Sequence, residues 1–503
     1  MDCLFMVMGN MNKNQTKLIV RTNDYNVPKD HISRFVVEFI EESIKKMDIK
    51  IEEKKDGRHS FNICSMLKLL VYAKIEHMDS ARVIADMAKY HDIFKYMCDG
   101  ITPSERSIQR YRDEYGEYYE QLLEMTLKKA SDENLSEFNH VAIDGTIKKG
   151  YNANHNTISK KETNILINYY NGVKIEEEIL DKLHKPAKNL IENTKLSDKE
   201  KLEKLYDIKT QFTLTGQDKI PMNDIEARKM KGKKGNFYIA YNVQSAVDYD
   251  TKLICAVNVT QSPTDHYELP QIADKAIKNL GKIPEHMSAD TIYLNPTSLS
   301  YFKNNNIDGL IPTRKQSKEK IGKLNKNPFH KDHFEYNGEK DAFKCPAGQY
   351  LTFYNQYTIE SKDPEKPDKI KRIYNNYEAC KNCKFKKDCI SQKQSHRTIT
   401  ENGNRLQIEM YFKMEKEEYQ DEYSKRPCVE GPFGTLKEYY HIEQEVVIGK
   451  TKTEQKINLN ALAYNIKRLY NILNDKENNK EDICEFCENI SVTHQLELDI
   501  YIK

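Results

Sequence analysis

The sequence lacks the features that mark membrane and secreted proteins. No stretch of its 503 residues approaches the roughly 20 consecutive apolar residues that cross a bilayer. The opening segment, MDCLFMVMGN, has no basic region and too short an apolar run for a secretion signal. We therefore expect a soluble, cytoplasmic protein with no membrane partner.

The sequence also lacks a large net charge of either sign, since 79 basic and 77 acidic residues leave a formal charge of +2. The overall balance therefore says nothing about nucleic acid, and only local clusters can. One cluster without acidic residues consists of Arg228, Lys229, Lys231, Lys233 and Lys234. Residues 366–397 hold ten Lys or Arg against three Asp or Glu. Each run is a candidate DNA-binding surface, and a solvated face is the alternative interpretation.

The order of the predicted elements indicates a mixed α/β fold. Residues 28–135 follow helical periodicity, and residues 172–209 have the charged pattern of a helical insertion. The predicted strands cover residues 140–146, 236–248, 253–259, 286–290 and 309–312. Helices are predicted between them at 266–279 and 296–305. The order strand, hairpin, helix, strand, helix, strand is typical of a mixed sheet.

A helix that could read DNA is predicted to start near residue 102. Thr102 can cap it, Pro103 suits its first position and Glu105 can close a capping box. The side chains on its first turns include Arg106, Gln109 and Arg110. A helix-turn-helix unit places such side chains against base edges, so we predict DNA contacts here. A plain helical bundle is the alternative.

Two of the predicted strands end in a carboxylate, at Asp144 and at Asp290. The carboxyl ends of strands in open α/β sheets are where functional sites gather. A lone Asp at a strand end is usually a turn or capping residue, but two on neighbouring strands form a candidate site.

A third carboxylate, Glu430, lies in a segment with a regular spacing of polar groups. If residues 423–437 form one helix, four side chains fall within a sector of roughly 60° at about 100° per residue. They are Tyr423, Arg426, Glu430 and Lys437. Glu430 can bind a hard cation, while Arg426 and Lys437 can meet phosphates. Two prolines can kink or start the helix, and an ion-paired surface helix is the alternative.

Together these motifs resemble the bacterial insertion-sequence transposases that carry an Asp-Asp-Glu triad. Their third motif reads Tyr, two residues, Arg, three residues, Glu, six residues, Lys, and the segment above has every spacing. Thr291-Ile292 stands where the family favours Ala-Gly. Further matches are Ile143 to Thr146, Ser288 to Asp290 with Tyr293, Gly57-Arg58 with Leu67 to Leu70, Asp224 to Arg228, Tyr241 to Gln244 and Leu462 to Leu469.

The resemblance implies a DNA transposase with a ribonuclease-H-like mixed-sheet core. Asp144, Asp290 and Glu430 would then hold two Mg²⁺ or Mn²⁺ ions, which stabilise both oxygens of an in-line phosphoryl transfer. The residues expected to contact DNA are Tyr423, Arg426, Lys437 and Arg228. The partners would be the terminal inverted repeats of its own element and target DNA, bound by a homodimer associated with the nucleoid.

The matches also predict a division of the chain into segments. The expected segments are a tail at 1–27, a helical DNA-binding domain at 28–135, a catalytic core from 136–150, 223–330 and 399–475, a helical insertion at 151–222, a Cys-rich insertion at 331–398 and a tail at 476–503.

Cysteine usage points to reduced thiols or metal ligands, because eleven is an odd number and no secretion signal is present. Four cysteines with one CxxC pair lie between the second and third carboxylates. They are Cys345, Cys380, Cys383 and Cys389. Such a set suits tetrahedral Zn²⁺. His396 can substitute for one of them, and four reduced thiols in a basic loop are the alternative.

The other cysteines carry no expected role. Cys484 and Cys487 form a second CxxC in an acidic tail, where we do not expect a metal. Those expected to be buried or incidental are Cys3, Cys64, Cys98, Cys255 and Cys428.

Two further functions stay open. One is a DNA-binding protein that has lost catalysis, and Mg²⁺-dependent nicking of terminal-repeat DNA separates it from a transposase. The other is a structure-selective nuclease of the same fold, which strand joining would exclude.

Overall fold

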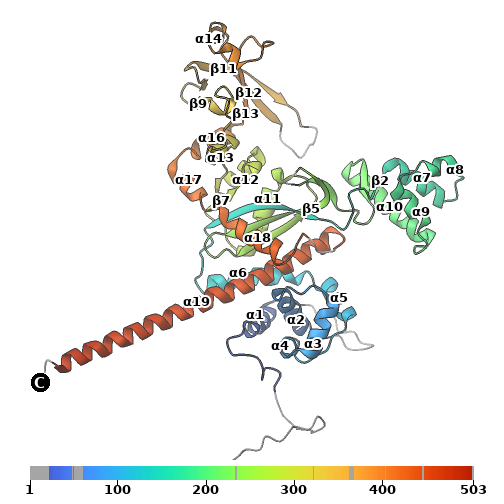
Figure 1. Ribbon diagram of the computed structural model, residues 1–503, viewed down its shortest axis with the longest axis vertical. Helices are drawn as coiled ribbons and strands as arrows, with labels where there is room; N and C mark the ends of the chain where they lie inside the picture. The colour runs from blue at the N-terminus through green and yellow to red at the C-terminus, as the bar shows by residue number, and fades with distance from the viewer. Residues whose placement is uncertain are drawn as a thin grey trace, which may run out of the picture. The chain divides into compact units, whose positions relative to one another are not determined.

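The computed structural model describes residues 22–500 apart from 48, 50–60, 233–234, 321, 362–367, 403 and 444–446. The chain divides into two compact units, Met1–Arg112 and Asp113–Lys503, and each is described by itself (Figure 1). Several residues named above lie outside the described part of the chain. They are Cys3, Gly57, Arg58, Lys233 and Lys234, together with the side chains of Cys484 and Cys487.

The described part of the first unit is helical. Its helices are α1 (Ile32–Lys46), α2 (Ile63–Ile75), α3 (Ala81–Tyr90), α4 (Asp92–Met97) and the start of α5 (Glu105–Glu114). Almost every residue of α2 is buried. A helix that is apolar around its whole circumference belongs in a core, so α2 is the centre of this unit.

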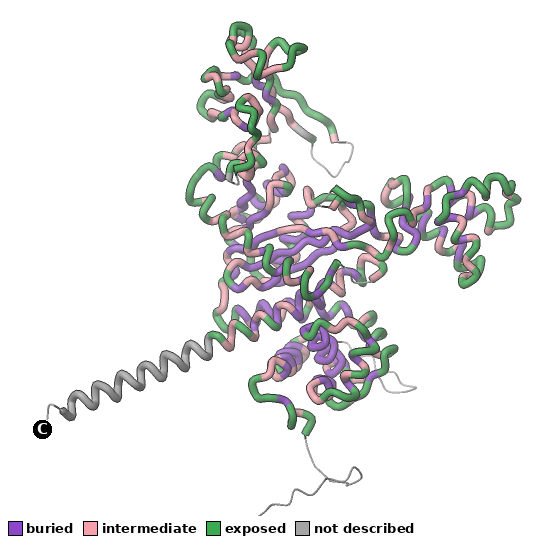
Figure 2. Tube along the Cα trace, viewed as in Figure 1, coloured by how far each residue is buried: buried purple, intermediate pink, exposed green. Residues whose placement is uncertain are grey.

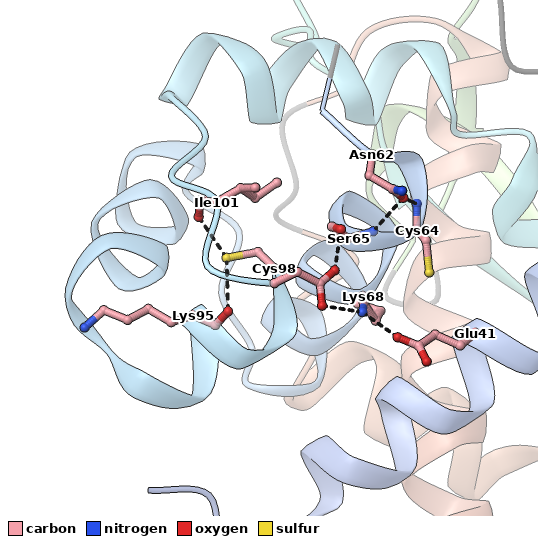
Figure 3. A network of polar contacts seen from close by, with 9 residues as sticks. Glu41, Asn62, Cys64, Ser65, Lys68, Lys95, Cys98 and Ile101 are labelled. Atoms are coloured by element: carbon pink, nitrogen blue, oxygen red, sulfur yellow. Dashed lines mark hydrogen bonds and ion pairs between the residues drawn. The ribbon is translucent and has the colours of Figure 1, made fainter. Parts of the chain in front are cut away.

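Two lysines are buried within α2, Lys68 and Lys74, each with 2% of its side chain exposed; Lys74 pairs with Asp79 at 2.8 Å, and Lys68 has two partners. Its Nζ lies 2.7 Å from Glu41 Oε1 and 2.9 Å from Asp99 Oδ1 (Figure 3). Burial alone would lower the pKa of Lys68, but these two carboxylates outweigh it and raise the pKa. An ammonium group withdrawn from water needs such partners, which here join α1 and the end of α4 to the central helix.

A mixed six-stranded sheet forms the centre of the second unit (Figure 1). Its strands are β1 (His140–Lys149), β4 (Arg228–Lys231), β5 (Phe237–Asp248), β6 (Ile254–Thr260), β7 (His286–Ala289) and β8 (Asp308–Leu310). They follow the order β4-β5-β1-β7-β8, and β6 also pairs with β5. Strand β5 is antiparallel to β1, β4 and β6, whereas β7 is parallel to β1 and β8. The predicted mixed α/β sheet is confirmed.

Helices α6 (Tyr118–Asp132), α11 (Leu269–Leu280) and α19 (Lys450–Ile500) all pack against β6. Figure 2 shows the buried trace of the sheet that they help to cover. The sequence predicts one helical domain as far as residue 135, but α6 packs on α19 and lies in the second unit. Helix α19 also continues through most of the segment expected as a tail. None of the described helices is long and apolar enough to cross a bilayer.

The outer edge of β6 is bonded by side chains of these helices. Asn465 of α19 accepts a hydrogen bond from the Ile254 N–H and donates to the Ile254 carbonyl, both at 2.9 Å. Asn279 of α11 donates to the Cys255 carbonyl at 3.0 Å. Buried backbone groups need partners, and here polar helix residues supply what a further strand would supply.

Two insertions extend from the sheet. The first runs through α7 (Lys160–Tyr170), α8 (Glu177–Asp181), α9 (Lys185–Glu192) and α10 (Asp198–Thr215), between β2 (Thr157–Ser159) and β3 (Lys219–Pro221). Its helices share an apolar core that includes Leu166, Leu205 and Ile208. Ser159 with Glu162, and Ser197 with Glu200, form capping boxes that start α7 and α10.

The second insertion is a small antiparallel sheet in the order β13-β12-β11-β10-β9. Its strands are β9 (Glu335–Asn337), β10 (Ala342–Lys344), β11 (Tyr350–Ile359), β12 (Lys369–Asn375) and β13 (Thr398–Asn402), with α14 (Tyr377–Lys381) and α15 (Lys386–Cys389). Phe334, Leu351, Tyr374 and Ile399 form its core. Helices α12 (Pro296–Asn304) and α13 (Arg314–Lys320) precede it, and α16 (Arg405–Lys413), α17 (Glu417–Tyr423) and α18 (Glu430–Glu438) follow.

We predict that Asn465→Ala lowers the free energy of unfolding by about 2–4 kcal/mol, because it leaves two buried backbone groups of Ile254 without partners. Thermal and denaturant unfolding measure this change. Lys467→Ala is the control, since Lys467 is exposed on the same helix. If both variants unfold alike, the edge bonds contribute little.

Candidate active site

Strands β1 and β7 bring two carboxylates together. Their parallel pairing runs as far as Ile143 opposite Ala289, so Asp144 and Asp290 stand at the next register position. Asp290 caps a short 3-10 turn, η2 (Thr291–Tyr293), and its Oδ1 accepts from the Thr291 N–H at 2.6 Å. Asp144 keeps 24% of its side chain exposed. The two predicted acids therefore lie on neighbouring strands, within reach of solvent.

The segment 423–437 is not the continuous helix that the predicted face requires. Helix α17 ends at Tyr423, the 3-10 turn η4 covers Arg426–Val429, and α18 begins at Glu430. Pro427 stands near the start of η4 and has no N–H to donate, so it breaks the helical hydrogen-bond ladder. The segment is therefore not one continuous α-helix, although Tyr423, Arg426 and Glu430 still lie near one another.

Arg426 joins the first and third carboxylates all the same. One terminal nitrogen lies 3.2 Å from Asp144 Oδ1 and the other lies 3.4 Å from Glu430 Oε1. The arginine side chain is 14% exposed, whereas that of Glu430 is 63% exposed. A largely buried guanidinium thus bridges an acid of β1 and an acid at the surface of α18.

The pKa values of Arg426 and Tyr423 lie well above neutral pH, so the charge on each side chain is fixed there. Burial alone would lower the pKa of Arg426, but Asp144, Tyr423, Asp290 and Glu430 outweigh it and raise the pKa. Burial raises the pKa of Tyr423 to about 12; Arg426 opposes this effect and the three carboxylates add to it. Arg426 is therefore a cation at neutral pH, and Tyr423 is a neutral phenol.

The carboxylates suit a divalent cation by chemistry, because Mg²⁺ prefers oxygen ligands. Asp144 and Asp290 offer such oxygens from neighbouring strands. Only Asp290 follows the end of its strand; β1 continues to Lys149, so the prediction that this strand ends in Asp144 was wrong. Within the described residues, no group of three or more His, Cys, Asp or Glu is arranged to hold a metal ion. This absence includes the four cysteines described below. At the carboxylates Arg426 accounts for it, since its guanidinium lies between Asp144 and Glu430, and its Nε is buried without a partner. The donors fit the ions if Arg426 releases the exposed Glu430.

A fourth carboxylate, Asp265, lies on the other side of the Asp144 backbone. Its Oδ1 accepts from Asn242 and from Gln244, both at 2.7 Å. Gln244 in turn accepts from the buried Tyr293 hydroxyl. A Cβ at Gly145 would meet Asp265 Oδ1 at 2.4 Å, so only glycine fits there. Sequence reasoning missed Asp265, which starts a 3-10 turn (Asp265–Tyr267) five residues after β6 and so has no strand-end signal.

A second missed contact holds α17 against the sheet. His140 Nδ1 lies 2.6 Å from Glu422 Oε1, and its Nε2 lies 2.8 Å from Ser288 Oγ. Lys425 contacts the other oxygen of Glu422 at 2.7 Å. His140 is 4% exposed, at the start of β1. This contact fixes the segment that leads into Arg426 and Glu430.

The residues predicted to contact DNA differ in their burial and in their partners. Arg228 is buried and donates to the Ile225 and Ala227 carbonyls and to Gln211 Oε1 at 2.7 Å. Burial lowers its pKa, so this arginine is a structural residue and does not face a phosphate. Lys437 lies 3.9 Å from Glu443.

The predicted base-reading side chains on α5 are displayed at the surface. Arg106, Gln109 and Arg110 are exposed, whereas Ile108 and Tyr111 are buried. The helix begins at Glu105 and not at Pro103. Its cap is the Ser104 hydroxyl, which accepts from the Ser107 N–H at 3.2 Å, and not Thr102.

The four predicted cysteines converge in the second insertion. Cys345, Cys380, Cys383 and Cys389 all line one cavity of about 30 Å³. The Gln349 N–H donates to Cys345 Sγ at 3.3 Å. Burial raises the pKa of Cys389; Arg397 opposes this effect and the other three thiols add to it.

The structure also places His396 and the described cysteines outside the cluster. His396 does not line this cavity, and its Nδ1 lies 2.8 Å from Ser395 Oγ. Cys98 and Cys255 are buried, while Cys64 and Cys428 are half-buried.

Comparison with known families identifies two parts of the chain. Residues 344–470 match the model of a transposase DDE domain. Residues 21–114 match the model of a transposase domain (DUF772). The first range contains Arg426, Glu430 and the four cysteines, whereas Asp144 and Asp290 precede it. No curated protein matches the chain.

These matches define the class of protein. The second unit carries a DDE domain, the domain of an enzyme family that catalyses phosphoryl transfer. The protein is a transposase with this domain and a transposase N-terminal domain, which implies DNA transposition and DNA binding. Enzymes with this domain typically use divalent metal ions.

We predict that His140→Gln weakens the pH dependence of stability. Burial lowers the pKa of His140 below its ordinary value of 6.5, with Glu422 opposing the effect. The unfolded chain therefore binds the proton more readily, and the fold loses stability as the pH falls through about 6.5. The melting temperature of the wild type should fall between about pH 7.5 and 5.5, and that of the variant should fall less. His155→Gln, at an exposed histidine, is the control; equal falls in all three proteins would contradict the prediction.

Proposed function

We propose that this chain is an insertion-sequence transposase with a ribonuclease-H-like catalytic core. It binds the terminal inverted repeats of its own element and catalyses metal-dependent strand cleavage and transfer into target DNA. It acts as a homodimer on the paired ends. The observation that carries the proposal is the meeting of Asp144, within β1, Asp290, directly after β7, and the Arg426–Glu430 pair.

In this proposal Asp144, Asp290 and Glu430 hold two Mg²⁺ or Mn²⁺ ions. When bound, the ions supply the charge that stabilises the attacking and leaving oxygens of phosphoryl transfer. Without them, Arg426 neutralises the acids and keeps Glu430 near the sheet. Once DNA and the ions are bound, the guanidinium turns to a phosphate, for which its planar donors are suited.

DNA contacts are proposed for three further regions. Tyr423 offers a neutral hydroxyl beside the acids, and Lys437 offers a cation about two helix turns beyond Glu430 on α18. Arg106, Gln109 and Arg110 contact base edges of the terminal repeat, since they are exposed together on the opening turns of α5.

The four cysteines hold one structural Zn²⁺ in this proposal. Three features support it: the shared cavity, the CxxC pair and the hydrogen bond that the Gln349 N–H donates to Cys345 Sγ. Zn–S distances of about 2.3 Å require the thiols to close around the cavity. The ion would brace a small sheet whose apolar core is limited.

We predict that Asp144→Ala, Asp290→Ala or Glu430→Ala lowers Mg²⁺-dependent cleavage of terminal-repeat DNA by several orders of magnitude. The reason is that metal ions and positioning supply most of phosphoryl-transfer catalysis. Binding of the same DNA should persist, because the basic surface is unchanged. Arg426→Ala should lower cleavage less, through weaker phosphate contact. A cleavage assay beside a gel-shift assay measures both properties.

Glu203→Ala on α10 is the control, since this acid is exposed and lies in the helical insertion. Near-normal cleavage by Glu430→Ala would remove Glu430 from the site. Cleavage without strand joining by the wild type would favour the structure-selective nuclease, and binding without cleavage would favour a DNA-binding protein that has lost catalysis.

We predict that purified protein contains one zinc ion and that Cys380→Ser with Cys383→Ser loses it. The double variant should also melt at a lower temperature, because the small sheet loses its brace. Elemental analysis measures the zinc, with Cys64→Ser as the matched control outside the cluster. Zinc-free wild type, or zinc retained by the double variant, would rule out this site.

A further inference from the structure

An acid outside the proposed metal site lies directly behind it. Asp265 begins the 3-10 turn η1 (Asp265–Tyr267) and packs against Gly145, the residue after Asp144. A Cβ added at Gly145 would meet Asp265 Oδ1 at 2.4 Å and Gln244 Nε2 at 2.5 Å. Successive residues of a strand face opposite sides of the sheet. Asp265 therefore contacts β1 from the side opposite to the one that the Asp144 side chain faces.

Asp265 fixes the direction of two buried amide side chains. Its Oδ1 accepts hydrogen bonds from Asn242 and from Gln244 at 2.7 Å each, and Gln244 Nε2 also lies 2.9 Å from Asn242 Oδ1. An amide carries a donor and an acceptor, whereas an ionised carboxylate only accepts. Both amides must therefore turn their nitrogen toward Asp265, and the oxygen of Gln244 is left for a different partner.

That partner is the turn that carries the second metal-binding acid. Gln244 Oε1 accepts a hydrogen bond from the hydroxyl of Tyr293, which is the last residue of η2 and is fully buried. Burial raises the pKa of the Tyr293 phenol well above its ordinary value, so the hydroxyl remains a donor. Asp290 caps the same turn. A chain of hydrogen bonds thus leads from Asp265 through Gln244 to the turn beside Asp290.

A second contact joins the two 3-10 turns. His266 Nδ1 lies 2.8 Å from the carbonyl oxygen of Ile292, and Asn295 donates a hydrogen bond to the His266 carbonyl. Turn η1 is therefore bonded to η2 both through the buried amides and through its own backbone. The place of Asp290 relative to β1 depends on η1.

We propose that Asp265 is a positioning residue for the two metal-binding aspartates. It supports Asp144 by packing behind β1, and it holds the turn of Asp290 through Gln244 and Tyr293. It acts through the hydrogen bonds that it accepts and not through its charge. Metal ligands must be held to within about half an ångström, and the groups behind them usually decide this. The inference rests on the proposed function and names the residue that sets the spacing of the ligands.

The test measures Mn²⁺ binding by the full-length protein, with free Mn²⁺ followed by electron paramagnetic resonance. The binding that Asp144→Ala removes defines the site. We expect Asp265→Ala to weaken this binding about tenfold, the lower end of what the loss of a group behind a metal ligand costs. Asp265→Asn keeps an accepting oxygen and should bind Mn²⁺ nearly as the wild type does. An equal loss in both variants would overturn the proposal, because charge would then be what acts.

Cleavage of terminal-repeat DNA provides a second measurement. Asp265→Ala should need about tenfold more Mn²⁺ to reach half of its maximal rate, and its rate should recover when Mn²⁺ is saturating. A maximal rate that stays low at every Mn²⁺ concentration would contradict a role in holding the metal ligands.

Tyr293→Phe tests the path from Asp265 to the second turn. It removes the hydroxyl that Gln244 accepts and should also weaken Mn²⁺ binding. Combined with Asp265→Ala it should add little, because residues of one hydrogen-bond network are not additive. Fully additive losses would contradict the path through Gln244.

Asn465→Ala separates positioning from a general loss of stability. Asn465 bonds the backbone of β6 and contacts none of the residues of this network. This variant should melt at a lower temperature and bind Mn²⁺ as the wild type does. If it loses Mn²⁺ as Asp265→Ala does, instability explains both variants and the proposal is wrong.

The outcomes distinguish the inference from the proposed function. If Asp144→Ala binds as much Mn²⁺ as the wild type, the proposed metal site fails and the inference fails with it. If Asp144→Ala loses the ion while Asp265→Ala binds it normally, only the inference fails.

Discussion

Two carboxylates on neighbouring strands, Asp144 within β1 and Asp290 directly after β7, repel each other, and the arrangement of the second unit depends on the cation that offsets this repulsion. In the folded chain that cation is Arg426, which contacts Asp144 and also brings Glu430 toward the sheet. The 3-10 turn that carries the arginine is short, and contacts through His140 and Glu422 hold the preceding helix in place. An isolated buried charge would cost far more than this paired one. Arg426 therefore already compensates the charge of the acids, and divalent ions that bind here must displace this arginine.

Local pattern was sufficient for much of the fold. Apolar runs before Asp144 and Asp290 predicted two strands, although β1 continues past Asp144 to Lys149. The continuous helix predicted for residues 423–437 was wrong, since Pro427 interrupts it, but Tyr423, Arg426 and Glu430 still lie near one another. The prediction that Arg228 contacts DNA was wrong for a different reason. A cluster of basic residues in the sequence does not show which of the side chains face solvent. The alternation of β4 turns Arg228 inward and Lys229 outward, so a strand pattern could have separated them.

The remaining features join residues that are distant in the chain. His140 meets Glu422, Asn465 meets Ile254, and Asp265 lies against Gly145. None of these pairs has a local signature, because each forms only when separate elements dock. A single sequence gives the strand and the helix but not the side chains that couple them. The four thiols are an intermediate case, since their spacing predicted convergence and the small sheet supplies the turns that bring them to one cavity.

The bonding along β6 has a consequence for assembly. An outermost strand normally offers its N–H and C=O groups to any other extended chain, which is a common route to strand addition and to aggregation. Here Asn465 and Asn279 already occupy groups on that side, and α11 and α19 cover it. A second molecule could add a strand there only by displacing both helices. Any pairing of subunits is therefore directed away from β6, toward surfaces that can be joined without opening the core.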